Sequence, residues 1–429
     1  MKNLPAILVI LIAYSGINAQ SGDYFIGPPK YSFIQYNQAK LILPEDESGA
    51  ERLFSRLDSL MLYGIGKINI VHIGGSHLQA DVYSHQIRKR LQTLQADMNG
   101  GRGFVFPYRA ARTNNPSNYR ISFSGSWETC KNTQFNRICP LGLSGISVKT
   151  SDNKARISIN PNTDPEISYS FTRVKVFHLP SMYNLRISVN DSLFAGIYDT
   201  LGGFSLFEIP ESYSLNMFLH KADSINSEFT LFGISLENDS PGLVYHAIGV
   251  NGARLSSYIN CQFYSQHLAA LEPDLLIFSI GTNDANTRDF DNNRYRIEYE
   301  QLIEISKIAA PNAVVLVTVP NDCYYMKRYV NRNTEIMKDE IFSLAKTNNY
   351  IVWDFYTAMG GLNSSQTWYN NGLMQHDRIH FNREGYLIKG DLFVTAFLRA
   401  WEKNLADRTE KKISQFKGNN MSNPLVIDK

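Results

Sequence analysis

Two different spacings of hydrophobic residues alternate along most of the chain. β-type runs at 67–73, 243–249, 274–280, 313–319 and 350–355 predict strands, and the run at 274–280 is nearly continuously apolar. A continuous apolar run is typical of a strand that is covered on both faces in a parallel sheet. Apolar residues three or four positions apart predict helices between them, and the last of these spans about 383–405. The alternation predicts a doubly wound, flavodoxin-like α/β fold with a parallel sheet.

The helical spacing disappears between about residues 114 and 240. Short β-type runs recur there, and Gly, Pro, Asn and Asp separate them. This pattern predicts an inserted all-β domain, a jelly-roll-like sandwich. The alternative, a set of long loops, is uncommon in compact domains. We therefore expect an α/β domain in two parts, 20–113 and 241–407, around the insertion at 114–240, with a polar tail at 408–429.

The first residues predict a signal peptide over 1–19. Lys2 supplies a positive charge, residues 4–14 form an apolar run, and 18–20 offers a small-residue cleavage site. The run is shorter than the roughly 20 residues that a membrane-spanning helix needs. We expect an exported protein, periplasmic or extracellular, without a transmembrane anchor; the alternative is an uncleaved anchor.

Composition and charge narrow the class of partners. The chain has 429 residues, 43% of them hydrophobic, and its formal net charge is +2. That length and composition allow a packed core, and so small a charge gives no field that favours nucleic acid or an anionic membrane.

Four cysteines remain to be placed: Cys130, Cys139, Cys261 and Cys323. Export permits disulfides. Cys130 and Cys139 are close enough in sequence for a bond between them to close one loop, but spacing alone does not determine the pairing. The other two are more typical of buried thiols. No CxxC motif and no His/Cys cluster has zinc-ligand spacing, so we expect neither a metal nor another cofactor.

The candidate nucleophile is Ser76. It follows the first strand and the glycine pair 74–75, and a helical pattern begins soon after it. A strand, a tight glycine turn, a serine and a helix together expose a hydroxyl at the carboxyl end of the strand. Taken alone, the stretch fits a turn that caps a helix even more readily.

Four further residues could act together with Ser76 in acyl transfer. Gly252 and Asn283 follow two other predicted strands, and Asp377 and His380 lie in the loop after the last one. Ligand sites in such sheets form at the carboxyl ends of the strands. His380 would act as the base, and Asp377 would orient it. The oxyanion donors would be the backbone N–H groups of Ser76 and Gly252 and the side-chain amide of Asn283.

Other roles stay open for each of these residues. The glycine could serve only a turn, the asparagine could only brace its loop, and the Asp–His pair could be a surface ion pair. The base could also be His77 or His376.

The sequence resembles the SGNH (GDSL-like) esterase superfamily in four blocks, at 74–77, 251–252, 281–284 and 377–380. Within it, residues 101–104, the β insertion and residues 249–253 look like the secreted bacterial peptidoglycan O-acetylesterases. The resemblance implies a carbohydrate-binding-like insertion and the removal of acetyl groups from a glycan.

One position departs from the family pattern. The family usually has Asp where this chain has Gly75, a position that shapes the turn and lies outside the triad. We expect a secreted serine esterase for short acyl esters, with an acylated polysaccharide or a small ester as substrate. The alternatives are a glycan-binding protein with a decayed esterase site and a lipase-like enzyme for longer acyl chains.

Overall fold

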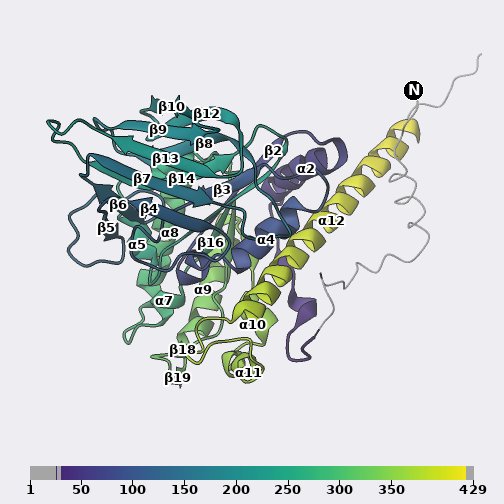
Figure 1. Cartoon of the computed structure of the whole chain (residues 1–429). Coiled ribbons are helices and arrows are strands. Elements are labelled where there is room, and N and C mark those ends of the chain that lie inside the picture. The colour runs from purple at the N-terminus through teal and green to yellow at the C-terminus, as the bar shows by residue number, and fades with distance from the viewer. Residues whose placement is uncertain (1–25, 27–29, 422–429) are drawn as a thin grey trace, which may run out of the picture.

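The computed structural model describes residue 26 and residues 30–421, with side chains to residue 415. The expected signal peptide at 1–19 lies outside these residues. A parallel sheet covered by helices forms one part of the molecule, and two antiparallel sheets lie to one side of it (Figure 1). No helix in the described residues is both long and apolar enough to cross a membrane.

The parallel sheet has the predicted flavodoxin-like order. Its parallel strands, from one edge across, are β15 (Gly242–Gly249), β2 (Lys67–Gly74), β16 (Leu275–Ser279), β17 (Val314–Thr318) and β20 (Ile351–Trp353). β1 (Leu41–Ile42) joins β20 in the antiparallel direction. The second strand of the α/β fold thus pairs with the outer side of the first, which creates a switch point beside β2.

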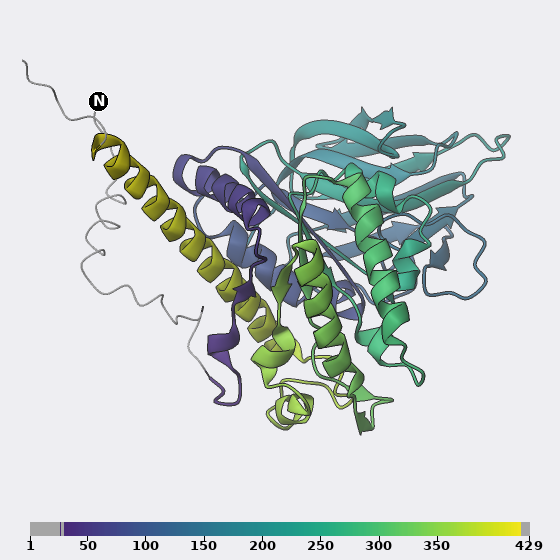
Figure 2. The ribbon, with the colours of Figure 1, turned by 180° about the vertical axis from the view of Figure 1, so that it is seen from behind.

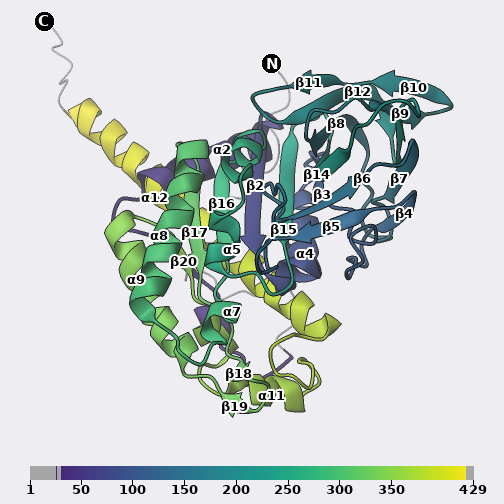
Figure 3. The same ribbon diagram turned by 90° about the vertical axis from the view of Figure 1, so that its left-hand side faces the viewer.

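Helices cover both faces of this sheet (Figures 2 and 3). One face carries α2 (Ser48–Tyr63), α4 (Tyr83–Gln92) and α12 (Arg383–Met421), and the other carries α5 (Leu255–Ile259), α6 (Tyr264–Ala269), α8 (Asn292–Ala309) and α9 (Asn333–Asn348). Shorter helices are α3 (Ser76–Gln79), α7 (Thr282–Ala285), α10 (Phe355–Met359), α11 (Ser364–Asn370) and the 3-10 turn η2 (Tyr36–Gln38). The helix expected to end near Leu405 continues to Met421.

Burial of both faces of the sheet explains why adjacent residues of one strand can both be apolar. In β2, Ile70 packs with the helices α2 and α12, whereas its neighbour Val71 packs with the core on the side of α8 and α9. Successive residues of a strand point to opposite faces, so both must be apolar when both faces are buried.

The antiparallel part contains two sheets with a shared hydrophobic core. One has the order β10 (Ser192–Ala195), β9 (Asn184–Val189), β13 (Leu215–His220), β7 (Lys154–Asn160), β4 (Arg120–Ser124). The other has the order β11 (Ile197–Asp199), β12 (Phe204–Ser212), β8 (Phe171–His178), β14 (Phe229–Glu237), β6 (Ile146–Thr150), β5 (Glu128–Lys131), and β3 (Gly101–Val105) also pairs with β14. A separate hairpin joins β18 (Tyr324–Tyr325) to β19 (Tyr329–Val330).

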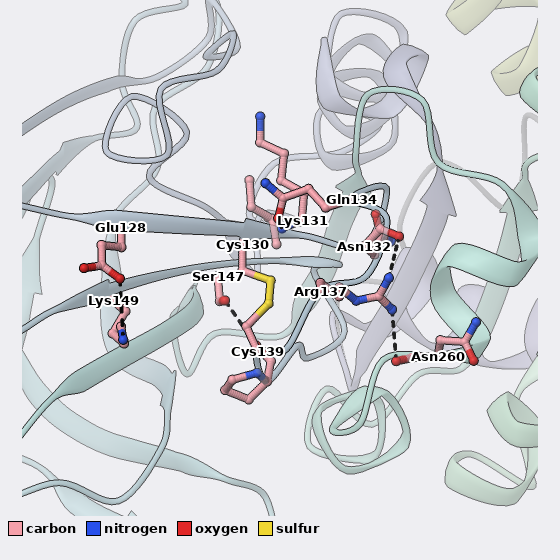
Figure 4. The surroundings of a disulfide bond; sticks show 12 residues. Glu128, Cys130, Lys131, Asn132, Gln134, Arg137, Cys139, Ser147, Lys149 and Asn260 are labelled. Atoms are coloured by element: carbon pink, nitrogen blue, oxygen red, sulfur yellow. Dashed lines mark hydrogen bonds and ion pairs between the residues drawn. A yellow bond between two sulfur atoms is a disulfide. The ribbon is translucent and has the colours of Figure 1, made fainter.

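A disulfide closes the loop that follows β5. Cys130 and Cys139 are bonded, with their Cα atoms 6.5 Å apart, and Cys261 and Cys323 are buried free thiols. Within this loop the Arg137 guanidinium donates to the carbonyl oxygens of Asn132 at 2.9 Å and of Asn260 at 3.2 Å (Figure 4). The loop is therefore attached to the end of α5 in the α/β part.

Candidate active site

The turn after β2 presents Ser76 at the carboxyl end of the strand. β2 ends at Gly74, and α3 begins at Ser76. A Cβ atom on Gly74 would lie 2.6 Å from the carbonyl oxygen of Ser279, so this turn has no room for a side chain. The glycine lets the chain bend tightly against β16, and the serine hydroxyl then stands at the end of the sheet.

Ser76, His380 and Asp377 form a continuous hydrogen-bonded chain. The Ser76 Oγ lies 2.9 Å from the Nε2 of His380, and the Nδ1 of His380 lies 2.8 Å from the Oδ2 of Asp377. Burial raises the pKa of Asp377, but hydrogen bonds from the His380 ring and from the backbone N–H groups of Ile379 and His380 outweigh it and hold the pKa well below its usual value. An ionised carboxylate favours a proton on Nδ1, so Nε2 is the ring nitrogen that can accept a hydrogen bond from the Ser76 hydroxyl.

The two other candidate histidines have different surroundings. The Nδ1 of His77 lies 2.9 Å from the hydroxyl of Tyr386, and burial holds the pKa of His77 well below its usual value. His376 is exposed and packs edge-on against Tyr369. The hydrogen bond to the Ser76 hydroxyl comes from His380.

Gly252 and Asn283 line the same cavity as Ser76 and His380. The Nδ2 of Asn283 donates to the carbonyl oxygen of Ala253 at 2.9 Å, so the amide is held at the turn that contains Gly252. A carboxamide nitrogen carries two hydrogens, so one remains for another acceptor. Gly252 has φ of +81°, in the left-handed region that favours glycine.

The cavity over Ser76 has a volume of about 420 Å³ and is lined by carboxamides. Asn and Gln supply six of its eleven lining residues, and none of the eleven is Asp, Glu, Lys or Arg. The lining residues are Ser76, Gln79, Ala80, Asn114, Asn115, Asn251, Gly252, Asn283, Gln375, His380 and Tyr386. A larger hollow of about 860 Å³ lies between α2 and α12, and it contains none of the predicted site residues.

Sequence reasoning missed Gln79, Asn114, Asn115 and Gln375. The last three lie outside regular helices and strands and carry no motif. The spacing from Ser76 could have identified Gln79, because residues three apart on a helix share a face and Gln79 lies three residues after Ser76.

Gly75, where the chain departs from the family pattern, faces the Asn283 amide. Its backbone has φ of −100°, outside the left-handed region. A Cβ atom there would lie 3.2 Å from the Nδ2 of Asn283 and 3.6 Å from the carbonyl oxygen of Ala253. A side chain at this position would therefore press on one of the candidate oxyanion donors.

A buried ionic cluster supports the segment between α3 and α4. The Asp81 carboxylate lies 2.6 Å from the Arg102 guanidinium and 3.2 Å from that of Arg88, and it accepts from the Nδ2 of Asn118 at 2.9 Å. Burial raises the pKa of Asp81, but the two arginines outweigh it and hold the pKa well below its usual value. Arg102 belongs to the 101–104 stretch that carried the narrower resemblance, and its contacts join the α/β part to the antiparallel part.

Comparison with known proteins agrees with this architecture. Residues 220–388 match the GDSL-like lipase/acylhydrolase family. A solved peptidoglycan O-acetylesterase is 22% identical with a TM-score of 0.66, over 87% of this chain and 99% of that one. An acetylxylan esterase from Geobacillus stearothermophilus is 18% identical over 37% of this chain and 73% of its own, with a TM-score of 0.29. No curated protein matches the sequence.

The family match, over residues 220–388, bears out the predicted resemblance to the SGNH (GDSL-like) esterases. Over most of its length, the chain has the fold of a peptidoglycan O-acetylesterase.

Proposed function

We propose that the protein is an exported serine esterase that removes acetyl groups from a polysaccharide such as peptidoglycan. The observation that carries this proposal is the hydrogen-bonded chain from Ser76 through His380 to Asp377 at an amide-lined cavity. The solved peptidoglycan O-acetylesterase with the same fold supports the choice of polymer.

The proposed reaction has two steps. The Nε2 of His380 takes the Ser76 proton while the Oγ attacks the ester carbonyl, and the resulting oxyanion accepts hydrogen bonds from the N–H groups of Ser76 and Gly252 and from the Asn283 amide. His380 then protonates the departing sugar oxygen, which leaves as a hydroxyl, and Ser76 remains acetylated. Water, deprotonated by His380, attacks this ester; acetate leaves as His380 returns the proton to the Oγ of Ser76.

The cavity lining favours a sugar with a short acyl group over a fatty acyl chain. Carboxamides both donate and accept hydrogen bonds, as the hydroxyl and acetamido groups of sugars require. A long acyl chain gains about 0.8 kcal/mol for each buried CH₂ only where apolar surface receives it. None of the lining residues is Val, Leu, Ile, Met or Phe, so no large aliphatic side chain is there to receive such a chain.

We further propose that residues 114–240 form a jelly-roll-like, carbohydrate-binding-like unit between the hydrolase segments 20–113 and 241–407. Trp127 belongs to its hydrophobic core, and Tyr169 is buried against His85 of α4, so neither ring is free to stack on a sugar. Phe123 and Phe135 are 40% and 92% exposed and can stack on sugar rings. The Cys130–Cys139 disulfide supports export to an oxidising compartment through the signal peptide at 1–19.

The test compares wild type, Ser76→Ala and the control Ser59→Ala on O-acetylated peptidoglycan and on p-nitrophenyl esters. Ser59 lies on α2, where its hydroxyl bonds to the carbonyl oxygen of Ser55. We expect acetate release by wild type and the control, a loss on the order of 10⁶ in kcat for Ser76→Ala, and falling rates from acetate to butyrate to longer esters. An inactive wild type that binds the glycan would support the decayed-site alternative, and a preference for long esters would support the lipase-like one.

A further inference from the structure

The last residue of α3, Gln79, lies one turn after Ser76 and lines the same cavity. We propose that Gln79 is a positioning residue that fixes the turn carrying the Gly252 N–H in the oxyanion hole. This inference rests on the proposed esterase function. The side chain of Gln79 is 2% exposed, so its polar atoms depend on partners within the protein.

The oxygen of Gln79 contacts the oxyanion turn directly. Its Oε1 accepts the backbone N–H of Asn251, the residue before Gly252, at 2.7 Å. On the other side of the turn, the Nδ2 of Asn283 donates to the carbonyl oxygen of Ala253 at 2.9 Å. The turn is therefore held from both sides, by a side chain of the nucleophile helix and by a side chain of α7.

The nitrogen of Gln79 contacts the loop that leads into the antiparallel sheets. Its Nε2 donates to the carbonyl oxygen of Asn114 at 3.0 Å and to the Oγ1 of Thr113 at 3.2 Å. Because a backbone carbonyl can only accept and a backbone N–H can only donate, these partners determine the orientation of the carboxamide. Gln79 thus links three walls of the cavity.

The hydrogen bonds on both sides of this turn matter because Gly252 has little intrinsic conformational preference. Glycine populates positive and negative φ about equally, so the +81° observed at Gly252 depends on its surroundings. The oxyanion donor works only if its N–H points at the developing charge before the reaction. Loss of the Gln79 oxygen should therefore weaken transition-state binding, while the Ser76–His380 bond stays in place.

The experiment uses Gln79→Met, which keeps the volume and removes the hydrogen bonds, together with the matched control Gln92→Met. Gln92 is also 2% exposed, and its Nε2 donates to the carbonyl oxygens of Gly101 at 2.8 Å and Leu243 at 2.7 Å, away from the cavity. Values of kcat and KM with p-nitrophenyl acetate and the melting temperature are measured for each.

We expect Gln79→Met to lower kcat by about 10- to 100-fold, somewhat less than the loss of a whole oxyanion donor. KM should change by less than about threefold, because the interaction is gained in the transition state. Gln92→Met should lower the melting temperature while kcat stays within about twofold of wild type.

Gln79→Glu keeps an oxygen facing the Asn251 N–H and should recover part of the lost kcat. Phosphonylation of Ser76 by a p-nitrophenyl phosphonate, which uses the same donors, should slow together with kcat.

Two results would overturn the inference: a kcat for Gln79→Met like that of Gln92→Met, or a raised KM at unchanged kcat. If Gln79→Met does not fold, Gln79→Asn, whose shorter side chain cannot span the same partners, must show the same fall in kcat. Failure of the proposed function looks different. In that case wild type itself lacks turnover, or its turnover survives Ser76→Ala.

Discussion

The carboxylate of Asp377 holds both the ring and the backbone of His380. Its Oδ2 lies 2.8 Å from the Nδ1 of the imidazole, and its Oδ1 accepts the backbone N–H of the same residue at 3.0 Å. One side chain therefore sets the tautomer of His380 and the course of the loop that carries it.

Asp377→Asn separates these two tasks. The amide oxygen can still accept the backbone N–H groups, but a carboxamide no longer enforces a proton on Nδ1 of His380 or stabilises the imidazolium. By analogy with the equivalent change in chymotrypsin-type enzymes, kcat should fall by about 10⁴-fold with the fold retained.

Asp291→Asn is the matched control for this substitution. Asp291 accepts the backbone N–H groups of residues 293 and 294 in the same local pattern, but it caps α8 instead of orienting a histidine. The kcat of the Asp291→Asn variant should stay within about twofold of wild type, because asparagine caps helices as well as aspartate does. Equal activity of the two variants in a p-nitrophenyl acetate assay would remove Asp377 from the mechanism.

The Asp81 cluster predicts a large and acid-sensitive contribution to stability. Asp81→Asn would leave Arg88 and Arg102 buried without a counter-charge, at a cost of about 3 kcal/mol in the free energy of unfolding. Glu384→Gln, in an exposed pair with Lys30, should cost less than about 1 kcal/mol. Urea unfolding at neutral pH measures both, and similar values for the two variants would contradict the prediction.

The pH dependence of this contribution has a definite sign. The pKa of Asp81 is lower in the folded protein than in the unfolded chain, where an aspartate titrates near about 3.9. The stabilisation is therefore fully present above that value and is lost as the pH falls toward the folded-state pKa. Wild type should lose more stability than Asp81→Asn between neutral pH and about pH 3.

The sequence predicted those parts of the site that follow from periodicity and strand ends. Ser76, Gly252 and Asn283 meet at one edge because parallel strands end there. The wall at 114–115 was not predictable, since its asparagines belong to no repeat or motif and approach Ser76 only through the tertiary fold. The length of α12 was also missed, because its polar end pairs with α2, as Arg408 does with Asp58 at 2.7 Å.

The antiparallel part can be tested for polymer binding without removing it. Excision of 114–240 would also remove Asn114 and Asn115 from the cavity wall, so a substitution is the sharper experiment. Phe135→Ala, on the disulfide-closed loop, should lower kcat/KM on O-acetylated peptidoglycan about threefold to tenfold, as expected for one lost aromatic contact. Hydrolysis of p-nitrophenyl acetate should not change.

Tyr63→Ala is the control for this substitution, because Tyr63 is 72% exposed at the end of α2, in the α/β part. It should leave both activities as they are. An equal loss on both substrates in Phe135→Ala would count against a role for this loop in holding the polymer.

The last prediction concerns Gly75. Its φ of −100° is open to other residues, so backbone strain does not forbid a side chain there. A new Cβ would meet the Nδ2 of Asn283 at 3.2 Å, and the amide must yield by a few tenths of an ångström. Gly75→Ala should therefore lower kcat severalfold, because it displaces the proposed oxyanion donor Asn283 and adds no compensating bond. Gly75→Asp brings the same Cβ, but its carboxylate can accept from backbone N–H groups and stiffen the turn before Ser76, so we expect it to hold or raise kcat. Both variants should stay within about 1 kcal/mol of wild type in stability. Turnover of p-nitrophenyl acetate and a thermal melt measure these effects. A fall in kcat and melting temperature for Gly75→Asp would show a turn built around glycine, and an inactive wild type rescued by Gly75→Asp would identify a decayed esterase.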